Sequence, residues 1–120
     1  MSEIQDILSD LGNVSGIAGN AVLTTDGIMV ASQLAHGVLD DVVAGLSSFL
    51  ISTTSRTLKE AGMGGFSRFV LHSTHGRMVF VDIGDAVLVV LMTQFANIDD
   101  CLHDVHDAAA ELRKASRIQL

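Results

Sequence analysis

Apolar segments separated by short glycine-containing turns occupy the middle of the chain, between Gly64 and Thr93. This pattern predicts three strands joined by two tight turns, at 66–73, 77–83 and 86–92. The turns contain His75-Gly76 and Gly84-Asp85, residue types that tolerate the positive φ of a short hairpin. Ala86 to Met92 contains no polar residue, which predicts a mid-sheet strand covered on both faces.

The first third of the chain predicts a short helix followed by a second hairpin. Apolar residues at helical spacing favour a helix over 2–11, with Ser2 as its N-cap. Residues 16–24 and 28–33 are typical of strands, and Thr25-Asp26-Gly27 between them predicts a hairpin turn.

Two longer helices are predicted, at 39–61 and 97–116, and Asn97 is the expected cap of the second. One face of the first helix is formed by Leu39, Val43, Leu46, Leu50, Thr53, Thr57 and Ala61. Val42 and Phe49 extend this face on one side, and Ile51 and Leu58 extend it on the other. The apolar arc then covers roughly half the circumference, more than the stripe of about 100° that a surface helix needs. We therefore expect this helix to contact both its own sheet and a second chain.

The predicted order is α-β-β-α-β-β-β-α, in a single domain over residues 1–120. It indicates an α+β fold with one five-stranded antiparallel sheet and helices on both of its faces. The chain is 48% hydrophobic with a mean hydropathy of +0.45, which is high for a domain of this size. The surplus of apolar residues predicts an oligomer in which a partner covers some of them.

Charge and composition exclude some classes of binding partner. A net charge of −7 argues against nucleic acid, which binds basic surfaces, and the absence of Trp and Tyr leaves little for base stacking. The single Cys, the acidic start and the lack of an apolar run of about 20 residues predict a cytoplasmic protein with no membrane insertion.

No arrangement of residues predicts catalysis. No nucleophile elbow or phosphate-binding loop occurs in the sequence. His103 and His106 lie three apart among carboxylates, but no set of four metal ligands accompanies them. Cys101 has no basic neighbour in sequence that would lower its pKa. We expect no enzyme activity, no cofactor and no resident metal.

Two stretches give the chain a family resemblance. AVLTTDGIMVAS at 21–32 is a strand, an Asp-Gly turn and a short returning strand, and VLHSTHGRMVFVDIGDAVLVVLM at 70–92 contains two glycine turns and a very hydrophobic last strand. In this order and spacing they resemble the Roadblock (dynein light-chain) family over essentially the whole chain. The resemblance implies a profilin-like sandwich that dimerises, with middle strands joined edge to edge and long helices side by side.

For this chain the resemblance implies a dimer seam and a partner surface. The expected seam consists of Val42, Phe49, Phe66, Arg68, Val70 and His72. The expected partner surface is the polar strip Ser48, Ser52, Ser55, Arg56 and Lys59 on the long helix.

Because family members bind Ras-like small GTPases, we expect a homodimer that regulates or scaffolds such a GTPase, with activation possible through the GTPase's own switch loops. A purely structural subunit of the dynein light-chain type and a small-ligand sensor are the alternatives.

Overall fold

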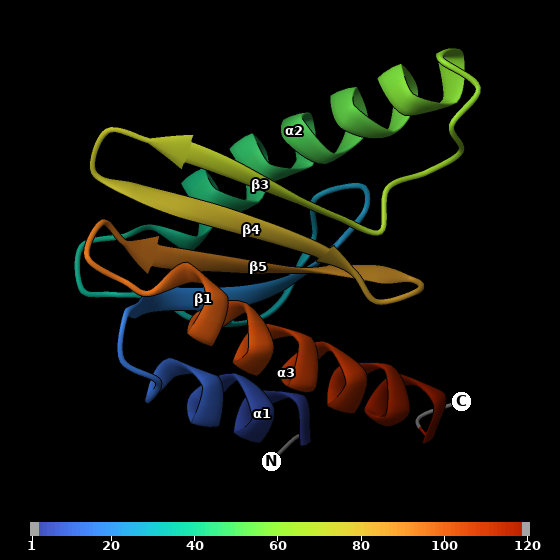
Figure 1. Ribbon diagram of the computed structural model, residues 1–120. Coiled ribbons are helices and arrows are strands. Elements are labelled where there is room, and N and C mark those ends of the chain that lie inside the picture. Colours follow the sequence, from blue (N-terminus) through green and yellow to red (C-terminus); the bar gives the residue numbers. More distant parts are fainter. Residues whose placement is uncertain (1–2, 119–120) are drawn as a thin grey trace.

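The chain folds in the predicted order, and the computed structural model describes residues 3–118 (Figure 1). The elements are α1 (Glu3–Gly12), β1 (Ile17–Thr24), β2 (Met29–Gln33), α2 (Asp40–Glu60), β3 (Arg68–Ser73), β4 (Gly76–Asp82), β5 (Ala86–Thr93) and α3 (Ile98–Ile118). Each end lies within two residues of its predicted position, and the α+β fold class is confirmed. The predicted cap Ser2 lies outside the described residues.

The five strands form one antiparallel sheet in the order β2-β1-β5-β4-β3. The apolar strand β5 lies at its centre, and six of its eight residues are buried. Strands β2 and β3 are the two edges, so one side of each has no strand partner within the described chain. The prediction of a mid-sheet strand at Ala86 to Met92 is therefore confirmed.

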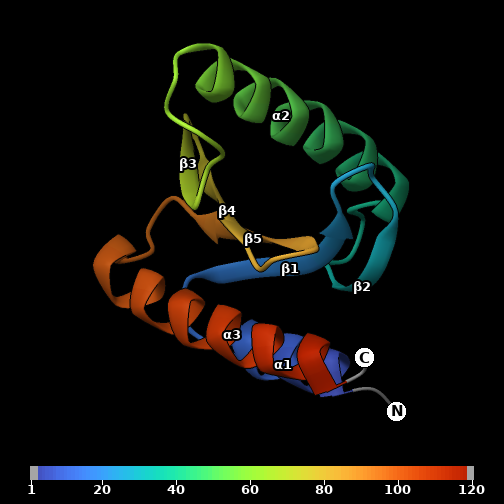
Figure 2. The same cartoon turned by 90° about the vertical axis from the view of Figure 1, so that its right-hand side faces the viewer.

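Helices cover both faces of the sheet, as Figure 2 shows, with α1 and α3 side by side on one face and α2 on the other. The larger cluster of buried side chains joins α1 and α3 to residues such as Val79, Leu88 and Val90. The smaller cluster joins α2 to Phe80 and Val89. Alternate residues of each central strand thus enter opposite clusters, as the strand period requires.

The short helix α1 is held by apolar burial and one buried polar contact. Ile7, Leu8 and Leu11 are buried against the sheet and α3. The fully buried Asn20 of β1 donates from Nδ2 to the Leu8 carbonyl oxygen at 3.1 Å. These contacts stabilise a helix that is too short to persist alone.

The tight turns differ in how well they were predicted. Gly27 and Gly84 have φ of 95° and 106°, as a hairpin glycine should, whereas no non-glycine residue within 3–118 has positive φ. His75 and Asp85 therefore do not use the positive φ that their residue types tolerate. Gly76 is the first residue of β4 and pairs with Ser73, so Thr74 and His75 form the turn.

Helix α2 packs on the sheet with a different face from the one that its sequence pattern predicted. Its buried residues are Val43, Ala44, Ser47 and Ile51. Leu39 and Leu46, which were expected on the same face as Val43, are exposed instead. The small side chains Ala44 and Ser47 let the helix approach the sheet, so burial centres on them rather than on the largest apolar residues.

Gly76 provides a test of the packing between β4 and β5. A Cβ at Gly76 would lie 2.7 Å from the Met92 carbonyl oxygen, which belongs to the backbone of β5 and cannot move freely. We expect Gly76→Ala to lower the free energy of unfolding by about 1–3 kcal/mol in urea denaturation.

Gly45→Ala is the matched control, since nothing lies within 4 Å of a Cβ at this helical position. It should leave stability unchanged or raise it by up to about 1 kcal/mol. Equal effects of the two substitutions would contradict the close contact between Gly76 and β5.

Candidate functional site

Helix α2 presents an exposed apolar strip formed by Leu39, Val42, Leu46 and Phe49. These residues are spaced by three, four and three positions, which places them on one side of the helix. Leu46 and Phe49 are 62% and 67% exposed, far more than is usual for large apolar side chains grouped together. We call these four residues the apolar strip.

The predicted polar strip follows the apolar strip along α2, with Arg56 two turns after Phe49, and it is only partly free. Ser52, Arg56 and Lys59 are exposed, whereas Ser48 and Ser55 are half-buried. Ser48 packs against the β1–β2 turn, because a Cβ on Gly27 would lie 3.0 Å from its side chain. The accessible part of this strip is therefore its C-terminal half.

The residues expected in the dimer seam are divided between α2 and the two faces of the sheet. Phe66 is on the α2 side, where its ring lies 4.9 Å from that of Phe69, and Phe69 in turn stacks on Phe80 at 4.4 Å. Val70 packs into the cluster on the α1 and α3 side, and Arg68 bonds to α3. Only Val42 and Phe49 of the predicted set belong to the apolar strip.

Two arginine–histidine pairs lie along β3, and the sequence analysis did not find them. Arg68 Nη1 lies 2.7 Å from His106 Nε2 on α3, and Arg77 Nε donates to His72 Nδ1 at 3.3 Å. The second pair follows from the hairpin register, which places His72 opposite Arg77. A two-residue turn at Thr74 and His75 would have predicted that register.

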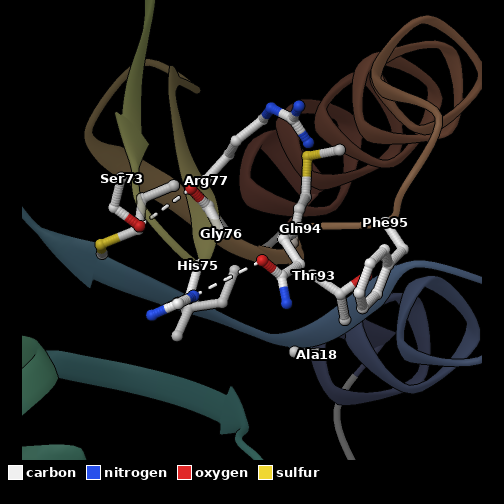
Figure 3. A pocket seen from close by; sticks show the side chains of 11 residues that line it. Ala18, Ser73, His75, Gly76, Arg77, Thr93, Gln94 and Phe95 are labelled. Carbon is white, nitrogen blue, oxygen red and sulfur yellow. Dashed lines mark hydrogen bonds between the residues drawn. The ribbon is translucent and has the colours of Figure 1, made fainter.

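A hollow of about 490 Å³ opens where β5 ends (Figure 3). His75 Nδ1 and Gln94 Oε1 face each other across 3.5 Å, while Arg77 points away from both. Phe95 stands at the rim and is 88% exposed. The wall also includes the apolar side chains of Met78 and Leu91.

The described residues contain no arrangement that would support catalysis by Cys101 or binding of a metal. Burial raises the pKa of the Cys101 thiol, and Asp104 and Asp100 raise it further, so the reactive thiolate is disfavoured. His103 Nε2 lies 3.7 Å from Asp107, an exposed pair within one helical turn. No group of three or more His, Cys, Asp or Glu residues in the part of the chain that the structure covers is arranged to hold a metal ion.

Cap and span assignments complete the geometry. Asn97 Oδ1 accepts from the Asp100 amide at 3.2 Å, which confirms Asn97 as the cap of α3.

No helix between residues 3 and 118 is both long and apolar enough to cross a bilayer.

The fold defines the class of protein: a three-helix sandwich around a five-stranded antiparallel sheet with one apolar helix face and two strand edges left open. The chain belongs to the Roadblock/LC7 domain family, whose sequence profile matches residues 3–92. Membership confirms the family resemblance found in the sequence.

Other proteins are similar to this chain in sequence or in fold. The Methanocaldococcus jannaschii protein MJ0310 is 34% identical over 95 residues, which span 79% of this chain and 83% of that protein. The structure of Myxococcus xanthus MglB matches with a TM-score of 0.92 at 15% identity, covering 98% of this chain and 97% of that one. A structure of MglB with a tetrameric arrangement matches with a TM-score of 0.86 at 18% identity, covering 98% and 90%. At these identities the two structures are similar in fold alone.

Proposed function

We propose that the protein is a non-catalytic, dimeric binding module that regulates or scaffolds a Ras-like small GTPase. The observation that carries the proposal is the apolar strip of α2 together with the open edge of β3 on the same molecule. An exposed row of large apolar side chains is costly in water, and an unpaired strand edge invites another strand. A second copy of the chain would cover both features.

Self-association has two further supports. Strand β3 is short, ends at Ser73, and has an outer edge without a strand partner in the described chain. Two copies of β3 that pair antiparallel along this edge would join two sheets along one seam. A similar fold, that of MglB, occurs in a tetrameric arrangement. In this proposal Val42 and Phe49 contact the partner helix, while β3 provides the strand seam.

The GTPase would bind the polar side of α2, where Ser52, Arg56 and Lys59 are exposed. This part of the proposal rests on the family, which the resemblance links to Ras-like GTPases. Activation would act by positioning the GTPase's own groups. Arg56 is the exposed arginine on this surface. The alternative to a regulator is a scaffold that binds the GTPase without preference for its nucleotide state.

A small-ligand sensor is less well supported. The hollow of about 490 Å³ falls within the size range of ligand pockets. However, its facing polar groups His75 and Gln94 already contact each other, and no residue of the apolar strip lines it. We therefore favour the interaction module.

The dimer is tested by a charge in the apolar strip. Light scattering at micromolar concentration should give about twice the chain mass of 12.7 kDa for the parent protein. Phe49→Asp should shift this to one chain mass, because burying an unpaired carboxylate would weaken association by about a hundredfold or more.

Phe95→Asp is the matched control, since Phe95 is also exposed but lies at the end of β5 rather than in the strip. It should remain a dimer. A parent protein that is monomeric at these concentrations would refute the seam.

The GTPase surface is tested with candidate Ras-like GTPases loaded with GDP or a GTP analogue. Arg56→Glu and Lys59→Glu should each weaken binding about tenfold, because they place repulsive charges on the contact surface. Lys114→Glu, the same charge change on α3, should have no effect. Unchanged affinity in the α2 variants would place the contact elsewhere, and equal affinity for both nucleotide states would favour the scaffold.

A further inference from the structure

Charge is unevenly distributed around α3 of this acidic protein. Asp104, Asp107 and Glu111 line a small hollow of about 140 Å³ between α3 and α1, together with Asp10. The opposite side of α3 faces β3 and β4, where Arg68, Arg77 and Arg113 contact neighbouring groups. Three arginines thus gather on one side of a chain whose net charge is −7.

These arginines are bonded to neutral acceptors, although the chain contains 14 acidic residues. Arg68 contacts His106 and Arg77 contacts His72, while Arg113 Nη2 donates to the Asp82 carbonyl oxygen at 2.8 Å. A guanidinium only donates, so the imidazole nitrogen facing it must accept and carries no proton there. Across residues 3–118 none of the three arginines forms an ion pair with a carboxylate.

The arginine side chains keep unused donors. A guanidinium has five N–H donors, and Arg68 and Arg77 use only a part of them in the contacts above. Arg77 Nη1 is buried and has no hydrogen-bond partner within the described chain. Nη1 is not accessible from outside the folded chain, so a ligand would meet the other donors of Arg77 and those of the exposed Arg68. A carboxylate, with two oxygens in a plane, is the group that matches the guanidinium fork.

The spacing of the two pairs matches an extended ligand. Arg68 precedes His72 by four residues on β3, and Arg77 lies opposite His72. Four residues of a strand span about 13 Å, and side chains at i and i+4 of an extended peptide lie on one face at the same separation. Two carboxylates of one extended segment could therefore reach both arginines.

We propose that Arg68, His72, Arg77 and His106 form a binding site for an extended acidic segment of a partner protein. We call these four residues the arginine–histidine site. Arg68 and Arg77 bind carboxylates, and the two imidazoles hold the guanidinium groups in place.

This site is separate from the proposed GTPase surface. It faces α3, whereas Arg56 and Lys59 lie on α2 across the sheet. If two β3 edges join, two copies of the site lie on the same side of the joined sheet, with like charges near the seam. Removing an arginine should then leave the dimer intact or strengthen it, while acidic ligands are lost.

The test uses a fluorescently labelled peptide in which glutamate alternates with threonine, and a counterpart with glutamine in place of glutamate. Anisotropy with the full chain should show binding of the glutamate peptide alone, weakening as salt rises. Arg68→Gln and Arg77→Gln should each lower the affinity about fivefold. Lys114→Gln, which removes the same charge elsewhere on α3, should leave it unchanged.

Each other outcome overturns the proposal. Equal binding of both peptides, no binding of the glutamate peptide, or an equal loss in Lys114→Gln would exclude a specific acidic-segment site. Displacement of the peptide by millimolar inorganic phosphate would identify a small-anion site instead. Light scattering on the same variants separates this proposal from the dimer: monomeric Arg68→Gln or Arg77→Gln would assign the arginine to the seam.

Discussion

Burial of β5 on both faces is the constraint on which the rest of the structure depends. Its run of apolar residues needs cover from two sides, and the chain provides α1 and α3 on one side and α2 on the other. The two covers are unequal. Two helices bury a large cluster on one face, whereas α2 alone serves the other and buries only four of its own residues.

The open surfaces follow from this inequality. Helix α2 uses small residues to approach the sheet, so its larger apolar side chains, Leu46 and Phe49 among them, remain in solvent. On the same side of the molecule the sheet ends at β3, whose outer backbone groups have no strand partner in the described chain. A partner that covers the exposed side chains of α2 and the free edge of β3 would remove both features from solvent. The other face of the sheet, already closed by α1 and α3, has charged rather than apolar groups at its edge.

Much of the fold could be predicted because its determinants are local. Asp26-Gly27 and Gly84 mark hairpins by backbone conformation, and the apolar run of β5 identifies the central strand. The rotation of α2 could not be predicted, because roughly half of its circumference is apolar and periodicity cannot choose which part meets the sheet. The arginine–histidine site depends on the register between β3 and β4 and on the contact of Arg68 with His106, which is 38 positions away on α3. The wide apolar arc predicted more apolar surface on α2 than one sheet face covers, and Val42 and Phe49 are indeed exposed, whereas Leu39 and Leu46 were expected on the face with Val43.

Hydrogen exchange of the β3 amides, measured over a range of protein concentrations, tests the central claim most directly. If the open edge of β3 is the seam between two copies, protection at residues 68–73 should rise with concentration. The other edge, β2 at 29–33, should exchange at a constant rate and serves as the internal control. Exchange in β3 that is fast and independent of concentration, as in β2, would contradict the account.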